Sequence, residues 1–258
     1  MCGRYASSRR PEDLAEEFEI DRGTVAETVT EPLAPDYNVA PTKEVYAVVT
    51  RPPRDEATET AGERQLRVLR WGLVPFWAKD PSIGSKMINA RMETVDQKPA
   101  FRRAFAKRRC LIPADGYYEW YPTEQLGKNG KPLKQPFFIR PEDGSVLAMA
   151  GLYEIWRDPP REDDAPLRFR WPCTVLTTSA EDSVGHIHDR MPLLVEPERY
   201  AAWLDPSHSE PSELRDLLVP AAPGRLEAYP VSTQVNSVRN NGPELLEPIP
   251  LDEPIEDA

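Results

Sequence analysis

The sequence predicts a single α+β domain with a mainly antiparallel β-sheet or barrel. Its 258 residues, 40% of them hydrophobic and 29% charged, are enough to bury one substantial core. Segments with a strand pattern are separated by short turns more often than by crossover helices, which favours antiparallel pairing. The composition does not change sharply anywhere, and no internal repeat is visible. Together these observations indicate one folding unit rather than a disordered chain or two domains.

The first half of the chain predicts two helices and two strands. The helix over 11–20 starts with proline, carries acidic residues in its first turn, and places Leu14 and Phe18 four residues apart on one face. The other elements of this half are a proline-containing loop over 37–42, strands over 44–50 and 66–74 with a polar loop over 51–63 between them, an aromatic loop over 75–77, and a helix over 98–107.

The second half is richer in strands. Strands over 110–113 and 116–121 flank Asp115-Gly116, a pair typical of a tight turn between paired strands. The remaining elements are strands over 135–140, 146–156, 171–178 and 226–231, loops over 123–134 and 157–168, and amphipathic helices over 197–204 and 211–218. We expect one domain over 1–242, followed by an acidic, flexible tail over 243–258.

The charge distribution is uneven. The net charge is −11, but the segment from Pro243 onward holds six acids and no base, and without it the net charge is −5. An acidic chain argues against strong binding of nucleic acid. Local clusters of arginine, such as Arg102-Arg103, leave room for one positive groove.

Membrane, secretory and metal-binding signals are not found in the sequence. No segment approaches the roughly 18 apolar residues of a membrane span, and the first residues lack the apolar core of a signal peptide. Three cysteines, Cys2, Cys110 and Cys173, are too few and too scattered for a disulfide framework or a zinc site. We therefore expect a cytoplasmic protein without a metal or another cofactor.

Cys2 is the most informative residue for chemistry. Removal of Met1 would make it the N-terminal residue, with an α-amine and a thiol on adjacent carbons. The amine of a chain terminus has a pKa near 8, so a useful fraction is neutral at pH 7. Such a pair can condense with an aldehyde to an imine and then to a five-membered thiazolidine ring. Alternatively, the amine can serve as the base for its own side chain in a hydrolase.

Three further positions carry side chains suited to acid–base work or to substrate positioning. Glu119 lies among aromatic residues in a strand, where burial would raise its pKa and suit it to proton transfer. His188 belongs to a short segment with two of the three histidines, which lacks the third ligand that zinc needs. Asn89 and Arg91 offer an amide and a guanidinium in a loop. Each of them is also compatible with an ordinary structural role. Phosphate-loop, dinucleotide and serine-hydrolase motifs are not found.

Six short motifs, taken in order, resemble those of the SRAP family, the SOS response-associated peptidases. The animal members of this family are known as abasic-site processing proteins. The resemblance runs from Cys2 to about Asn241. The motifs are Met1-Cys2-Gly3-Arg4-Tyr5, Tyr37-Asn38-Val39-Ala40-Pro41, Trp71-Gly72-Leu73-Val74-Pro75, Asn89-Ala90-Arg91-Met92-Glu93-Thr94, Gly116-Tyr117-Tyr118-Glu119-Trp120 and Ile187-His188-Asp189-Arg190-Met191-Pro192.

The resemblance implies a fold and an activity. The fold would be α+β around a twisted, mainly antiparallel, barrel-like sheet with peripheral helices. The protein would sense abasic sites in single-stranded DNA during the DNA damage response, and Cys2 would form a covalent thiazolidine crosslink with the opened sugar. It would then be found at the nucleoid when bound to DNA, and we expect it to act as a monomer.

The resemblance also implies roles for nine residues. Cys2 would supply the amine and the thiol, Glu119 would move protons, and His188 would act near the sugar oxygen. Asn89 would position Cys2 or the sugar. Arg4, Arg91 and Arg190 would hold flanking phosphates, and Pro41 and Trp71 would present flat surfaces to unstacked bases.

Two other activities suit the same residues. One is a thiol peptidase that acts at least on its own N-terminus, and the other is a non-covalent binder of single-stranded DNA. DNA lyase chemistry, by elimination at the imine stage, is a possible side reaction of the crosslinker. A peptidase does not need its nucleophile at the chain terminus, so the position of Cys2 favours the crosslinker.

Overall fold

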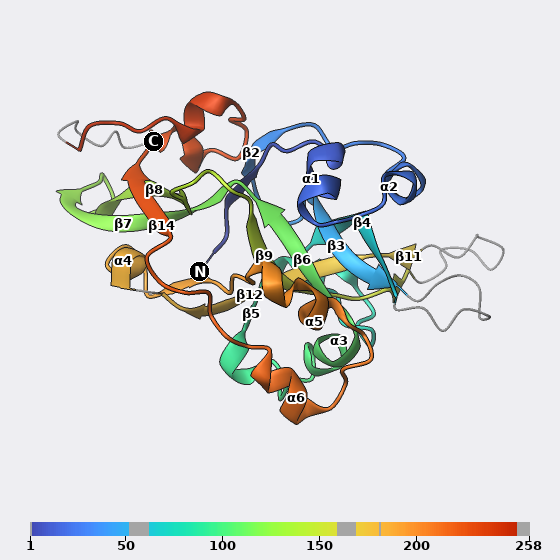
Figure 1. Ribbon diagram of the computed structural model, residues 1–258. Coiled ribbons are helices and arrows are strands. Elements are labelled where there is room, and N and C mark those ends of the chain that lie inside the picture. Colours follow the sequence, from blue (N-terminus) through green and yellow to red (C-terminus); the bar gives the residue numbers. More distant parts are fainter. Residues whose placement is uncertain (1, 52–61, 159–168, 181, 252–258) are drawn as a thin grey trace, which may run out of the picture.

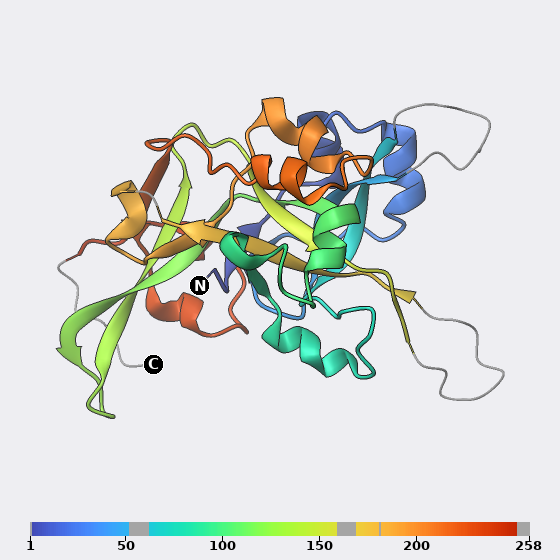
Figure 2. The same ribbon diagram turned by 90° about the horizontal axis from the view of Figure 1, so that it is seen from below.

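The protein is a mixed α+β domain, and the computed structural model describes residues 2–51, 62–158, 169–180 and 182–251. Two larger sheets form its centre and short helices lie around them (Figures 1 and 2). The strands are β1 (Tyr5–Ser7), β2 (Asp36–Val39), β3 (Glu44–Arg51), β4 (Glu63–Trp71), β5 (Asn89–Arg91), β6 (Arg109–Ala114), β7 (Gly116–Leu126), β8 (Pro132–Pro141), β9 (Leu147–Tyr153), β10 (Trp156–Arg157), β11 (Phe169–Arg170), β12 (Pro172–Ser179), β13 (Arg190–Pro192) and β14 (Leu226–Pro230).

The helices are short. The α-helices are α1 (Pro11–Glu17), α2 (Arg22–Thr28), α3 (Arg102–Lys107), α4 (Asp182–Gly185), α5 (Tyr200–Leu204) and α6 (Pro211–Asp216). The 3-10 turns are η1 (Pro81–Lys86), η2 (Met92–Thr94), η3 (Pro197–Arg199), η4 (Thr233–Asn236) and η5 (Pro243–Leu246).

The seven-stranded sheet closes into a ring. Its order is β13-β12-β4-β3-β6-β9, β12 also pairs with β9, and β5 pairs with β12. Most pairs are antiparallel, while β12 runs parallel to β4 and β5. Strands of such a ring are buried on both faces, which explains why β9 is apolar along its whole length. The predicted mainly antiparallel sheet is confirmed.

The second sheet lies beside the ring and carries the N-terminal strand. Its order is β14-β8-β7-β1-β2. Strands β7 and β8 extend from the body of the molecule as a long hairpin (Figures 1 and 2). The predicted loop over 123–134 was therefore wrong at both ends, because β7 continues to Leu126 and β8 begins at Pro132.

A buried arginine joins the helices to the ring. The Arg109 side chain, on a residue only 3% exposed, donates to the carbonyls of Trp203, Phe105, Ala106, Asp205 and His208. Burial lowers the pKa of this guanidinium to about 10. All five partners are backbone carbonyls near the C-terminal ends of short helices or in the loop after them. Arg109 supplies the hydrogen bonds that no further helix turn gives to these carbonyls.

Several sequence predictions need correction. Residues 37–39, predicted as the first part of a loop over 37–42, belong to strand β2, whose pairing with β1 a short polar segment does not reveal. The helix predicted over 11–20 ends at Glu17, and a second helix follows after Asp21, whose side chain accepts from the backbone N–H groups of Gly23 and Thr24. Parts of the predicted loops 51–63 and 157–168 lie outside the described residues.

The Asp115-Gly116 pair does not close a hairpin. Strand β6 pairs with β3 and β9, whereas β7 pairs with β1 and β8, so the chain passes from one sheet to the other at Asp115. The Asp115 carboxylate accepts from the backbone N–H of Ser8 and from Arg9. Its side chain thus anchors the N-terminal segment at the crossing point between the sheets.

The first part of the predicted tail is packed rather than flexible. Leu245 in η5 is fully buried in a small core with Tyr118 and Phe138. The backbone N–H of Ile249 donates to the carbonyl of Pro230. The segment from Leu245 to Ile249 is therefore part of the packed fold, and of the predicted tail only residues 252–258 lie outside the described residues.

No helix in the described parts of the chain is long and apolar enough to cross a membrane.

Candidate functional site

Strand pairing brings the N-terminal residues to Glu119. In the antiparallel pair of β1 and β7, Tyr5 lies opposite Tyr117, and the backbone N–H of Tyr118 donates to the carbonyl of Arg4. Continuing this register places residues 2 and 3 alongside Glu119. The N-terminal end of the chain accordingly lies in the middle of the molecule, near β5 and β12 (Figure 1). Cys2 and Glu119, which are 117 positions apart in the sequence, are therefore neighbours in the fold.

The carboxyl group of Glu119 is buried and titrates near neutrality. The residue is 3% exposed, and burial raises its pKa to about 7, against the opposing field of the N-terminal ammonium and of Lys134. A carboxyl group that is half ionised at pH 7 can both give and accept a proton during a reaction. The predicted burial of Glu119 is confirmed. Loss of hydration within the second sheet is the main cause of the raised pKa.

Cys2 is fully buried, and its thiol is held in the protonated form. Burial raises the pKa of the thiol well above its ordinary value, and the negative field of Glu119 adds to this. A stable thiolate, the usual mark of a thiol protease nucleophile, is therefore not what this environment favours. The thiol needs a nearby proton acceptor when it reacts, and Glu119 is the group whose charge acts on it most.

Asn89 ties the N-terminal segment to the ring. Its Nδ2 donates to the carbonyl oxygen of Cys2 at 2.7 Å, across 87 positions of sequence. Asn89 begins β5, which runs parallel to β12 with Asn89 opposite Val175. Its buried Oδ1 has no hydrogen-bond partner among the described residues, which leaves an acceptor free on the amide that holds Cys2. The predicted loop at this position is a short strand, and this explains how the amide is held in place.

His188 lies between α4 and β13 and faces the same electrostatic environment. The backbone N–H of Arg190 donates to its Nδ1 at 3.0 Å, so the neutral ring carries its proton on Nε2. Partial burial lowers the pKa of His188, as does the field of the N-terminal ammonium, while Asp189 opposes this. The ammonium and Lys134 act on both Glu119 and His188, so the two groups share one site.

Two of the predicted DNA-contact residues, half-buried Arg4 and buried Trp71, are bonded within the protein. Arg4 donates to Oδ1 of Asn38 and to the carbonyl of Val235, and its guanidinium lies 5.7 Å from the ring centre of Trp120. Trp71 is 1% exposed, and its Nε1 donates to the carbonyl of Ile88. A buried indole cannot stack on a base, so Trp71 supports the floor of the site instead.

The other predicted contacts lie at or near the surface. Pro41 is half-buried after β2, and Arg91 is exposed at the end of β5. Arg190 is mostly covered, with its side chain 16% exposed, and it forms a two-pronged ion pair with Glu93. Of the three predicted phosphate-binding arginines, Arg91 is therefore the one that the structure leaves most open to solvent.

Sequence analysis gave no role to an exposed pair of aromatic side chains. Phe76 and Trp77 are each 50% exposed, in the aromatic loop predicted over 75–77. The backbones of Gly72 and Gly84 approach each other closely next to this loop. Gly72 has a φ of +128°, and a Cβ built on it would lie 2.6 Å from the carbonyl oxygen of Gly84. Arg103 lies 4.1 Å from the ring centre of Phe76. Sequence analysis noted this loop without a role; the signal was two large aromatic residues in a turn.

Lys134 was also missed. It is an exposed residue of β8, and its positive charge acts on both Glu119 and His188. The sequence places it in a segment rich in glycine, lysine and proline, where a lysine has no distinguishing mark. Its relevance follows only from the pairing of β7 with β8, which puts it on the strand next to that of Glu119.

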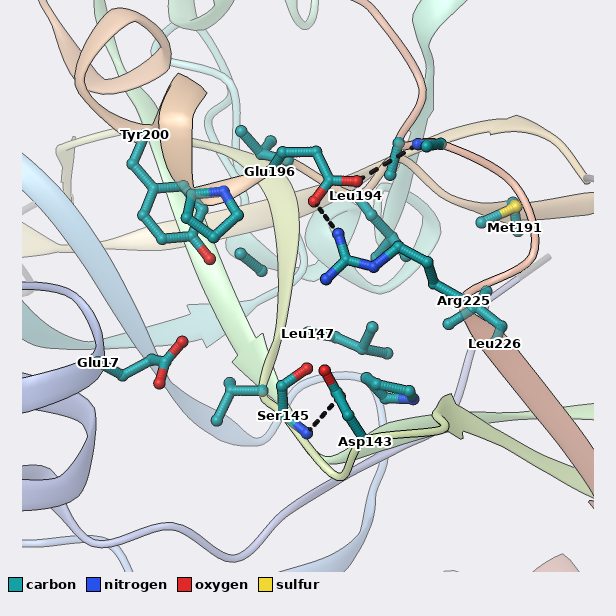
Figure 3. A pocket seen from close by; sticks show the side chains of 17 residues that line it. Glu17, Asp143, Ser145, Leu147, Met191, Leu194, Glu196, Tyr200, Arg225 and Leu226 are labelled. Carbon is teal, nitrogen blue, oxygen red and sulfur yellow. Dashed lines mark hydrogen bonds and ion pairs between the residues drawn. The ribbon is translucent and has the colours of Figure 1, made fainter.

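One cavity with a largely apolar lining lies away from this chemistry. It is lined by Leu147, Leu194, Leu226 and Tyr200, with the Glu196–Arg225 ion pair at its side (Figure 3). None of Cys2, Asn89, Glu119 or His188 lines it. Within the described ranges, no three histidine, cysteine, aspartate or glutamate side chains are grouped as metal ligands.

The fold and this site define an α+β protein that holds a near-terminal cysteine beside a buried carboxyl group, an amide and an imidazole. A family model described as SOS response associated peptidase (SRAP) matches residues 1–238. The chain therefore belongs to the SRAP family, and it is related to abasic site processing proteins.

Relatives match over nearly the whole chain. The abasic site processing protein YoqW of Bacillus subtilis is 38% identical over 247 residues, which cover 96% of this chain and 99% of the relative. The abasic site processing protein YedK of Escherichia coli is 33% identical, covering 96% of this chain and all of the relative. A solved structure of a protein from Bacteroides thetaiotaomicron has a TM-score of 0.76 at 24% identity, covering 96% of this chain and all of that one, which supports the fold.

Proposed function

We propose that this protein traps abasic sites in single-stranded DNA as a covalent thiazolidine formed by Cys2. The observation that carries the proposal is the grip of Asn89 on the Cys2 carbonyl, which holds the residue beside a carboxyl group with a pKa of about 7. Removal of Met1 is a required first step, because an amine within a peptide bond is not a nucleophile.

The reaction releases one water. The Cys2 amine adds to the aldehyde carbon of the opened sugar, and the resulting hydroxyl leaves as water to give an imine. The thiol sulfur then adds to the imine carbon and closes the ring, while the thiol proton moves to the nitrogen. Glu119 in its protonated form supports the departure of water, and as a carboxylate it accepts and returns the thiol proton.

His188 completes the acid–base set. With its proton on Nε2, the neutral ring can donate to a sugar oxygen and so favour the open aldehyde form. The lowered pKa keeps most of the ring neutral at pH 7. Cys2 is fully buried, and burial away from bulk water favours the condensation, since forming the imine releases the one water of the reaction.

The DNA strand would be held by exposed groups around the site. Arg91 and Lys134 offer positive charge, and Phe76 and Trp77 offer flat surfaces on which unpaired bases can stack. Arg4 and Trp71 bond to backbone carbonyls of the protein itself, whereas half-buried Pro41 could still meet an unstacked base. This arrangement concentrates positive charge locally in a chain with a net charge of −11.

The test is incubation with a single-stranded oligonucleotide that contains one abasic site, followed by a denaturing gel and intact-mass measurement. We expect a heat-stable shifted band, with a mass that corresponds to loss of Met1 and one water. Cys2→Ala should abolish the stable band, whereas Cys110→Ala, which also removes a buried thiol, should keep it. A stable adduct at the wild-type level in Cys2→Ala would refute the proposal.

The same experiment separates the alternatives. A band seen only under native conditions would indicate a non-covalent binder. Cleavage of the oligonucleotide without an adduct would indicate lyase chemistry. Release of Met1 by the purified protein itself, without any reaction with DNA, would favour the peptidase.

A further inference from the structure

The carboxylate of Glu93 forms an ion pair with the guanidinium of Arg190. It lies in η2, directly after β5, so the strand that carries Asn89 and Arg91 also places this carboxylate. Both of its oxygens accept from Arg190, at 2.6 Å from Nη1 and 3.0 Å from Nη2. Such a two-pronged pair is the geometry in which an arginine also binds a phosphate. One side of the guanidinium fork is thus already filled by an anion.

The remaining donors of Arg190 leave little capacity for a second anion. Nη2 also donates to the carbonyl and the hydroxyl of Thr177, at 2.7 and 3.2 Å. Nε is buried and has no hydrogen-bond partner among the described residues. Of the five N–H groups of Arg190, two remain, the buried one on Nε and one on Nη1, and the single bond that Nη1 can still offer cannot replace the fork. A phosphate that approaches Arg190 therefore meets the Glu93 carboxylate first.

The surroundings keep Glu93 charged. The hydrogen bond from Arg190 lowers the pKa of its carboxyl group, and the positive field of Arg91 acts in the same direction. Glu93 is 44% exposed in its side chain, so its bond to Arg190 can exchange with an anion from solvent. It lies between the fields of two of the arginines that sequence analysis assigned to phosphates.

We propose that Glu93 is a built-in competitor that occupies Arg190 in the free protein and that a DNA phosphate must displace. This inference rests on the proposed function, because it concerns the same DNA groove. Competition of this kind weakens binding to undamaged single strands, which then leave. An abasic strand is retained because the covalent step with Cys2 follows. The competitor thus shifts selectivity from affinity for DNA to the presence of an aldehyde.

The test is non-covalent affinity for a single-stranded oligonucleotide with a tetrahydrofuran site, which has the abasic shape but no aldehyde. We expect Glu93→Gln to bind roughly fivefold tighter at low salt, because breaking a surface ion pair costs up to about 1 kcal/mol. Arg190→Gln should bind no tighter than wild type. Adding Glu93→Gln to Arg190→Gln should give no more than the small gain expected from the loss of one negative charge, since the competition acts through that guanidinium.

The matched control is Glu198→Gln, which removes one exposed negative charge in η3. It measures the effect of net charge alone, and we expect a smaller gain than for Glu93→Gln. Weaker binding in Glu93→Gln would overturn the proposal, because Glu93 would then position Arg190 for DNA. An equal gain in the Arg190→Gln background, or with Glu198→Gln, would also overturn it. If wild type formed a crosslink with abasic DNA while Glu93→Gln showed no gain, this inference alone would fail; if wild type bound no DNA, the proposed function would fail and this inference with it.

Discussion

Replacing Glu119 by glutamine should slow the reaction and stabilise the fold at the same time. The amide keeps the size of the side chain but cannot carry the charge that burial disfavours. The pKa of Glu119 rises from an ordinary 4.5 to about 7 in the fold. One unit corresponds to about 1.4 kcal/mol, so ionisation of this group costs the folded state about 3 kcal/mol.

The sign of the pH dependence follows from the raised pKa. Below pH 4.5 the group is protonated in both states and has no effect. As the pH rises from 4.5 to 7, the unfolded chain loses this proton while the folded chain keeps it, so stability falls by about 3 kcal/mol and then stays level. Glu119→Gln lacks this fall. Relative to wild type it should therefore gain about 3 kcal/mol between pH 4.5 and pH 8.

The assay is urea unfolding of both proteins at pH 4.5, 6 and 8, with the difference in free energy plotted against pH. His188 titrates in both proteins, so the difference isolates position 119. The control Glu124→Gln removes an exposed carboxylate further along β7 and should give no such slope. In parallel, crosslink formation and reversal should both slow by about 10²-fold if the carboxyl group transfers protons.

Two results would refute this reasoning. A stability difference that does not change with pH would mean that the carboxyl group titrates normally in the fold. Crosslinking at wild-type rates in both directions, in a folded Glu119→Gln protein, would leave His188 as the proton-transfer group. A protein that is slower and also more stable at pH 8 would fit a site whose function is kept at a cost in stability.

Three further predictions concern structural residues. The double variant Cys110→Ala, Cys173→Ala removes two fully buried thiols and should lower stability by about 1 to 3 kcal/mol while crosslinking persists, as measured by urea unfolding and the abasic gel assay. Gly72→Ala should destabilise the protein by at least about 2 kcal/mol and weaken DNA binding. The control is Gly144→Ala, since Gly144 also has a positive φ (+71°) but no atom within 4 Å of its Cβ, and it should show a smaller thermal shift. Equal thermal shifts would contradict the role of the close approach between Gly72 and Gly84. Arg109→Leu should cost about 3 kcal/mol or more, because it leaves five carbonyls without their donor, and a midpoint of unfolding equal to that of wild type would contradict this.

Much of the fold could be predicted because long strands carry their own pattern. The apolar run around Val48, the run over 146–156 and the segment around Val175 all form strands of the ring. What failed were elements that exist only through their neighbours. β1, β5 and β13 have three residues each and no pattern of their own, and they are strands because β7 and β12 offer them partners.

The site was easier to name than to arrange. Cys2, Asn89, Glu119 and His188 stand out by residue type and by their motifs, and the structure brings them together. Whether each predicted DNA-contact residue is accessible to DNA depends on its burial, and a motif carries no information on burial. Trp71 and Arg190 have the right chemistry for a strand of DNA, yet the first is covered by the core and the second is paired with Glu93.

The first residues of the chain are held in place by almost the last ones. Arg4 donates to the carbonyl of Val235, 231 positions away, and Asn38 donates to the carbonyls of Val235, Ser237 and Asn240. During synthesis, the supports of the N-terminal strand therefore do not exist until residue 240 has been made, and contacts of such long sequence separation form slowly. A nascent chain shorter than this holds Cys2 and Arg4 without the carbonyls that fix them in the fold. The N-terminal strand is thus the first segment to be synthesised and among the last to reach its final surroundings.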